Sequence, residues 1–141
     1  MSVSSLEKTC LRQKVEYTRL TPETLLLSAF SEDGNYYDLY IRDDGEGNIQ
    51  AGVLFSLADR VIPAPALLCE QIALASEGRI AARFDEETDY INLVTCLDAG
   101  NLSQDTHKFA DLCESFSDML DQIEEEGTWG VKYFGGFRPY H

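Results

Sequence analysis

Apolar and polar residues alternate with two different periods along the chain, and each change of period predicts a new element. Residues 4–16 place Leu6, Cys10 and Leu11 on one face of a short helix. Residues 24–30 form an apolar run that is too short for a stable helix, while residues 36–42 and 49–55 alternate with the period of two that is typical of strands. Because short loops join these three strands, we expect an antiparallel meander, with a tight turn at Asp33-Gly34.

The second half of the chain repeats the change of period. A second helix is expected to begin around Pro63 and Pro65 and to end near Gly78, followed by strands at residues 79–85 and 90–97. Ser103 is expected to cap the last helix and Gly127 to end it. Its apolar face recurs every three or four residues: Phe109, Leu112, Cys113, Phe116, Met119, Leu120 and Ile123. The pattern predicts an α+β fold of order α-β-β-β-α-β-β-α, with helices packed on an antiparallel sheet.

The elements fill residues 1–126, and we interpret them as one domain followed by a tail at residues 127–141. The tail is rich in aromatic and small residues, which argues against regular structure: Trp129, Gly130, Tyr133, Phe134, Gly135, Gly136, Phe137, Pro139 and Tyr140. It either docks back on the domain or offers an adhesive strip to a neighbour. We favour docking, because exposed aromatic contacts promote aggregation.

The net charge of the chain limits the classes of molecule that it is expected to bind. The chain has 25 Asp and Glu against 11 Lys and Arg, for a net charge of −14. This field repels a phosphate backbone, so direct binding of nucleic acid is not expected, and a basic or mixed-charge protein is the better partner. No apolar stretch reaches the roughly 18 residues that a membrane span needs, and the first residues lack a signal-peptide core, so we expect a cytoplasmic protein without membrane contact.

Residues that could carry chemistry are few. The four cysteines contain no C-x-x-C pair, and three fall in apolar patterns, so we expect reduced thiols in the core. The only histidines are His107 and His141. An EF-hand loop starting at Asp43 fails at its later ligand positions. We therefore expect no catalytic residue, no metal and no cofactor, and interpret the protein as not an enzyme.

The pattern over residues 62–123 resembles the type III secretion chaperone-like fold. Residues 67–75 resemble the second helix of that family, residues 79–85 and 90–93 resemble the following hairpin, and residues 97–116 resemble the entry to the closing helix. Two branches share the fold: dedicated secretion chaperones of the CesT type, and the YbjN family of sensory transduction regulators. Val61-Ile62-Pro63, before the second helix, is more similar to YbjN. The aromatic tail departs from both.

The resemblance implies a homodimer that holds an extended or partly folded segment of another protein without a cofactor. It also implies that the second helix and the strand after it form the dimer seam, which assigns Leu68, Ile72, Ile80 and Ala82 to the interface.

The residues themselves suggest a binding surface on the sheet. If helices cover one face, the other is only partly covered, and Tyr36, Tyr40, Leu54 and Val94 are expected there, as an apolar strip within an acidic rim. In a second interpretation, the tail or another subunit covers these side chains. A different class of function also stays open: a small regulatory or sensor domain that binds a ligand between sheet and helix.

Overall fold

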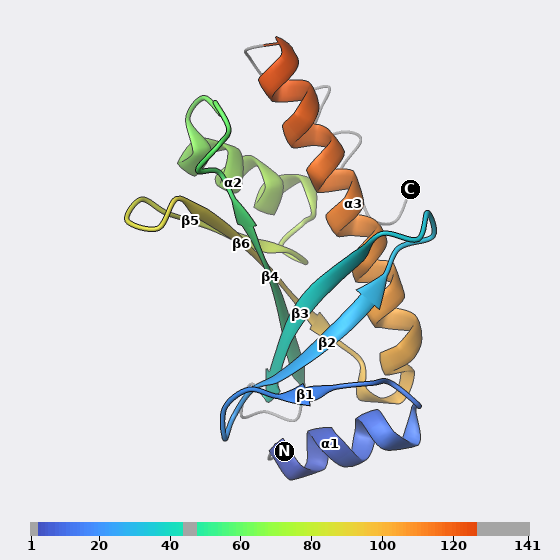
Figure 1. Cartoon of the computed structure of the whole chain (residues 1–141). Coiled ribbons are helices and arrows are strands. Elements are labelled where there is room, and N and C mark those ends of the chain that lie inside the picture. Colours follow the sequence, from blue (N-terminus) through green and yellow to red (C-terminus); the bar gives the residue numbers. More distant parts are fainter. Residues whose placement is uncertain (1–2, 44–47, 127–141) are drawn as a thin grey trace. The chain divides into compact units, whose positions relative to one another are not determined.

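The computed structural model describes residues 3–43 and 48–126 (Figure 1). Its elements, in chain order, are α1 (Val3–Arg12), β1 (Thr18–Arg19), β2 (Leu25–Phe30), β3 (Tyr36–Asp43), β4 (Ile49–Ser56), α2 (Pro65–Ala75), β5 (Ala81–Asp85), β6 (Tyr90–Leu97), the 3-10 turn η1 (Ala99–Asn101) and α3 (Leu102–Glu126). None of these helices combines the length and apolarity needed to cross a bilayer. The predicted aromatic tail at residues 127–141 lies outside the described residues.

The strands form one six-stranded antiparallel sheet in the order β1-β2-β3-β4-β6-β5. This confirms the predicted α+β fold. The two-residue strand β1 was not predicted, because Thr18 and Arg19 are both exposed and show no alternation. They join the sheet only because Thr18 pairs with Leu26 and Arg19 with Leu25.

Two compact units make up the chain. The first contains the described residues up to Val53 together with Thr95–Asp111, and the second contains Leu54–Val94 and the described residues from Leu112 onwards. The division falls within β4, β6 and α3.

In the first unit, β2 and β3 run side by side (Figure 1) and alternate as the sequence predicts. Leu25, Leu27, Leu39 and Ile41 are fully buried. The helix α1 packs near β3 and buries Leu6 and Cys10. These side chains form the core of this unit.

Helix α1 ends at Arg12, earlier than the predicted residue 16. Lys14 adopts a left-handed backbone with a φ of 58°, and its N–H donates to the carbonyl of Leu11 at 3.2 Å. The N–H of Val15 donates to the carbonyl of Cys10 at 2.8 Å. This pair of hydrogen bonds is the Schellman arrangement, which satisfies the last carbonyls of the helix and turns the chain away.

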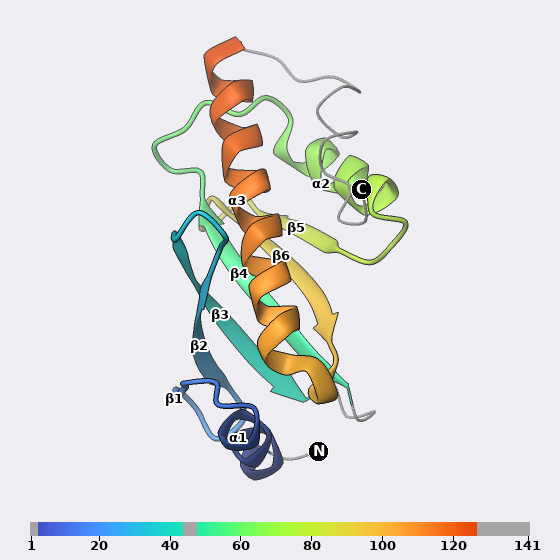
Figure 2. The same cartoon turned by 90° about the vertical axis from the view of Figure 1, so that its right-hand side faces the viewer.

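In the second unit, α2 packs against β5 (Figure 2). Pro65 opens the helix, as predicted, because its missing N–H costs nothing in the first turn. Its end again has a Schellman geometry: Glu77 has a φ of 57°, and the N–H of Gly78 donates to the carbonyl of Ala73 at 2.9 Å. In the same unit, the ring of Phe55 on β4 meets that of Phe116 on α3.

Helix α3 does not begin with the predicted Ser103 cap. Asp98 caps η1 instead: its carboxylate accepts from the N–H of Gly100 at 2.9 Å, and its own N–H donates to the carboxylate of Asp105 at 2.9 Å. The cap is therefore the carboxylate of Asp98 and not the hydroxyl of Ser103, because the extra 3-10 turn places Asp98 at the N-terminal end of the helical segment. The predicted apolar face of α3 is confirmed, since all its members except Leu112 are buried.

Candidate protein-binding surface

The outward face of the β2–β3 hairpin carries four apolar side chains, which we name the aromatic strip: Leu26, Phe30, Tyr36 and Tyr40. Their positions follow from the strand register. Leu26 lies opposite Tyr40, and Phe30 lies opposite Tyr36. Side chains on the same face at directly opposed positions are close neighbours, so each pair is a cross-strand contact.

Most of the aromatic strip is open to solvent. Exposed fractions are 56% for Phe30, 62% for Tyr36 and 39% for Tyr40, while Leu26 is half-buried. The rings of Phe30 and Tyr36 are tilted by 48° with their centroids 6.1 Å apart, within the range of favourable aromatic pairs. The strip is therefore an ordered apolar surface built from one hairpin.

Between the two apolar pairs lies a polar pair. Ser28 lies opposite Asp38, and both are exposed on the same outward face. Along the hairpin, one apolar pair is therefore followed by the acidic Ser28–Asp38 pair and then by the second apolar pair. An ionised carboxylate between apolar pairs favours a ligand that presents a basic or donor group between two apolar groups.

The turn of the hairpin is a tight one, as the Asp33-Gly34 pair predicts. The N–H of Ser31 donates to the carbonyl of Asn35 at 2.8 Å, and the N–H of Gly34 donates to that of Ser31 at 3.0 Å. Gly34 has a φ of +88°, which a residue without Cβ adopts at no steric cost. The turn sets the register that brings Phe30 and Tyr36 together.

Helix α3 holds the same end of the hairpin. His107 Nδ1 lies 2.7 Å from the carbonyl oxygen of Phe30. Asp111, one turn further along, accepts a hydrogen bond from the N–H of Glu32 at 2.7 Å. The imidazole Nε2 lies 3.7 Å from the Asp111 carboxylate. These contacts anchor Phe30 and Glu32 to α3, so they hold the turn end of the aromatic strip in place.

The four residues that the sequence assigned to protein binding are divided between the two units. Tyr36 and Tyr40 share the outward face of β3 in the first unit, as expected. Leu54 and Val94 belong to the second unit. Leu54 is 46% exposed on β4, whereas Val94 is half-buried on β6 opposite Ala81.

Sequence reasoning missed Leu26 and Phe30. Within the run Leu25–Phe30 nearly every residue is apolar, so hydrophobicity alone does not separate its two faces. The polar Ser28 was the available signal, because it marks the outward positions at a period of two and so includes Leu26 and Phe30.

The four residues of the predicted dimer seam differ in exposure, and the seam itself stays a prediction. Leu68, Ile72 and Ile80 are buried inside the chain, with at most 2% of each exposed. These three side chains pack in the core of their own unit. Ala82 alone of the four is partly exposed, on the edge strand β5. The outer face of α2 presents other residues, Leu67 and Leu74.

A shallow cavity of about 480 Å³, widely open to solvent, lies in the first unit beside the end of α1 and the segment that follows it. Cys10, Leu11, Lys14 and Val15 contribute to its lining. Burial raises the pKa of Cys10 to about 11, so its thiol stays protonated near neutral pH and is a poor nucleophile.

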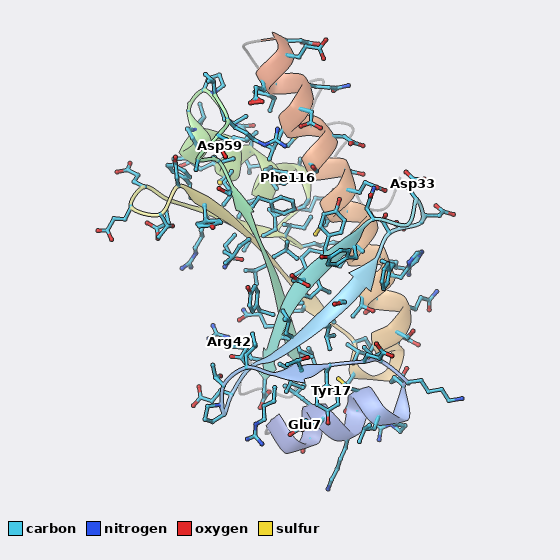
Figure 3. The ribbon with its side chains drawn as sticks, viewed as in Figure 1. Glu7, Tyr17, Asp33, Arg42, Asp59 and Phe116 are labelled. Atoms are coloured by element: carbon cyan, nitrogen blue, oxygen red, sulfur yellow. The ribbon has the colours of Figure 1, made fainter. Side chains whose placement is uncertain are left out.

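Tyr17, which also lines this cavity, points toward Glu7 (Figure 3) and donates to its carboxylate at 3.0 Å. The hydrogen bond to Glu7 raises the pKa of Tyr17, because the phenol must keep its proton to donate. Arg19 lies 3.8 Å from the same carboxylate. Of these three residues, Tyr17 is the one that lines the cavity.

The cysteines follow the predicted pattern. All four are free, and Cys10, Cys69 and Cys113 are buried while Cys96 is exposed. Among residues 3–43 and 48–126, no cluster of three or more His, Cys, Asp or Glu side chains could hold a metal ion.

Comparison with known proteins assigns the chain to no family. A scan against protein-family models found no match, and a search of curated proteins found none either. The resemblance to secretion chaperones therefore rests on the residue pattern.

Proposed function

We propose that this protein is a non-enzymatic, homodimeric protein-binding module, chaperone-like in its action, that holds an extended or partly folded segment of a partner. The aromatic strip is the observation that carries the proposal. Apolar side chains exposed side by side on a hairpin lose contact with water when a partner covers them. The strip offers area and shape rather than a reacting group.

The chemistry of the strip suggests the kind of segment it holds. Two apolar pairs flank the Ser28–Asp38 pair, and the chain as a whole carries a net charge of −14. A basic, amphipathic segment with apolar residues on either side of a Lys or Arg complements that arrangement. Steering by the acidic field would speed association and make it sensitive to salt.

A peptide library tests the proposal while the partner is still unidentified. We expect the wild-type protein to select short peptides that combine basic and apolar residues. The double substitution Phe30→Ser with Tyr36→Ser should abolish this selection, because it removes one apolar pair from the surface while leaving the buried face intact. Leu20→Ser is the matched control, since Leu20 is an exposed apolar residue outside the strip. Selection of no peptides by the wild type, or equal selection by the double variant, contradicts the proposal.

The homodimer is part of the proposal and needs a separate measurement. Ala82 lies on β5, the edge strand of the sheet, whose outer side has no neighbouring strand among the described residues. An edge strand can pair with an identical strand of a second copy. Light scattering should give the mass of two chains. A single-chain mass at all accessible concentrations would remove the dimer but leave the peptide-binding activity intact.

The cavity beside α1 supports a second candidate function, a small regulatory domain that binds a ligand. Its volume, about 480 Å³, lies within the range of small-molecule sites. A ligand that binds only the folded protein raises the unfolding temperature, so a thermal-shift screen measures this function directly. A reproducible rise that Leu11→Asp abolishes would favour it. No rise with any compound would count against it.

A further inference from the structure

Helix α2 is apolar on both of its faces. Its inner face buries Leu68, Cys69 and Ile72. Its outer face presents Leu67, which is 46% exposed, and Leu74, which is 70% exposed. A helix that is hydrophobic all round is normally covered on every side. Something is therefore expected to cover the outer face.

Three of the four exposed residues of α2 form a defined stripe. Leu67, Glu70 and Leu74 follow one another at spacings of three and four residues, which places them on one face of a helix. We name these three residues the α2 stripe. Glu70 is the one charged residue of α2. The stripe thus alternates apolar, acidic and apolar groups, and its natural complement is a segment of apolar and basic groups.

A second copy of the stripe is a poor complement. In a two-fold symmetric pair, the same patch faces itself, so Glu70 would approach Glu70 of another chain that also carries a net charge of −14. Like charges brought together in an interface oppose association.

The last residues of this chain have the complementary composition. Residues 127–141 contain Trp129, Phe134 and Phe137 among their aromatic residues, together with Lys132 and Arg138. They include no Asp or Glu, in a chain that has 25 acidic residues. The segment is therefore both the most aromatic and the least acidic part of a strongly acidic protein.

The segment that follows α3 is longer than α2. Helix α3 ends at Glu126, in the same unit as α2. A chain of about 15 residues can extend about 50 Å, whereas a helix of the length of α2 spans only about 16 Å. Residues 127–141 are therefore long enough to cover the full length of α2.

We propose that residues 127–141 bind along the α2 stripe of their own chain, with aromatic rings on Leu67 and Leu74 and a basic side chain facing Glu70. This contact is independent of the aromatic strip on β2 and β3. A basic, aromatic segment of the same chain occupies an apolar, acidic surface without the entropy cost of bringing two molecules together.

The single tryptophan makes the test direct. Trp129 is the one Trp of the chain and lies in residues 127–141, so its fluorescence reports on that segment alone. In the full-length protein we expect emission that is shifted to the blue of free tryptophan, and weaker quenching by acrylamide. The substitutions Leu67→Asp and Leu74→Asp together should shift the emission to the red and raise quenching toward that of free tryptophan.

Controls keep the result specific to the α2 stripe. Leu20→Asp alters a leucine outside α2 with the same exposed fraction as Leu67, 46%, and should leave the emission unchanged. Far-UV circular dichroism checks that the double variant folds. If it does not, Glu70→Lys replaces it: this surface change should raise quenching by repelling Lys132 and Arg138.

Three results would overturn the inference. Emission and quenching equal to those of free tryptophan in the wild type would show that the segment is not covered. A blue-shifted emission that survives the α2 substitutions would place it elsewhere. A blue shift that disappears on dilution, together with a dimer mass that falls, would assign the contact to a second copy.

Discussion

His107 Nδ1 lies 2.7 Å from the carbonyl oxygen of Phe30, which joins α3 to the end of the strand that carries the aromatic strip. Because a carbonyl only accepts hydrogen bonds, Nδ1 carries the proton in this contact. The hydrogen bond connects residues far apart in the chain and anchors the hairpin end that presents Phe30 and Tyr36.

Replacing this imidazole should weaken both stability and binding. For His107→Ala we expect the free energy of unfolding to fall by about 0.5–1.5 kcal/mol, the net value of one hydrogen bond. Peptide selection should fall as well, because the hairpin end loses its anchor. Urea unfolding and the peptide library measure the two effects. Lys108→Ala, at the exposed next position of α3, is the control. Unchanged stability would show that the contact contributes nothing.

Phe116 should be among the most sensitive positions of the second unit. It is fully buried, and its ring meets that of Phe55 edge to face, with the centroids 4.8 Å apart and the planes at 72°. Phe116→Ala leaves a cavity and loses this contact, so we expect a loss of about 3–5 kcal/mol in unfolding free energy. Phe116→Leu should cost less. Calorimetry or urea unfolding gives the values, and a change for Phe116→Ala no larger than that for the exposed Asp118→Ala would contradict the assignment.

The ion pairs of Arg60 should contribute little. Its guanidinium lies 2.7 Å from the carboxylate of Asp121 and 3.9 Å from that of Glu124, but the Asp121 side chain is 63% exposed. Water and salt screen such a pair, so Arg60→Ala should cost no more than about 1 kcal/mol. A double-mutant cycle with Asp121→Ala isolates the pairwise energy. A coupling energy that is large and insensitive to salt would show that the pair is better shielded than its exposure indicates.

The exposed Cys96 should react faster with thiol reagents than the three buried cysteines. Cys96 is exposed, whereas burial raises the pKa of Cys69 to about 11 and that of Cys113 to about 12. Because the thiolate is the reactive form, alkylation of the folded protein at mildly alkaline pH should label Cys96 first. Unfolding should make all four cysteines reactive. Peptide mapping identifies the labelled sites, and fast labelling of Cys113 in the folded protein would contradict its burial.

The raised pKa values of the buried thiols make the free energy of unfolding depend on pH. Each buried thiol has a folded-state pKa above its ordinary value of 9.0. The folded state therefore retains protons that the unfolded state releases, so the stabilisation is complete below about pH 9 and is lost as pH rises toward 11–12. We expect the free energy of unfolding to fall over this window. Cys113→Ala should reduce the slope, and a slope equal to that of the wild type would exclude a contribution from this thiol.

Most of the fold could be predicted from local patterns of apolar and polar residues along the chain. The alternation of Leu39 and Ile41 with Tyr36 and Tyr40 predicts which face of β3 is buried, because successive side chains of a strand point to opposite sides. The spacing of Phe109, Phe116 and Ile123 predicts the buried face of α3 in the same way. Such predictions succeed because they depend on backbone geometry within one element.

Two features of the helices could not be predicted from the sequence. The α2 pattern is apolar on both faces, so periodicity could not show that Leu68 and Ile72 turn inward while Leu67 and Leu74 stay exposed. The Asp98 cap depends on a 3-10 turn whose residues have no strong signature.

What the amino-acid sequence determined by itself was the type and order of the main elements, the excess of acidic residues and the composition of residues 127–141. Only the tertiary structure decided that Phe30 joins Tyr36 on one surface and that His107 holds the end of that hairpin. The physical reason is that side-chain periodicity acts within a few residues, whereas strand register and helix docking are set by which distant groups pack and form hydrogen bonds together.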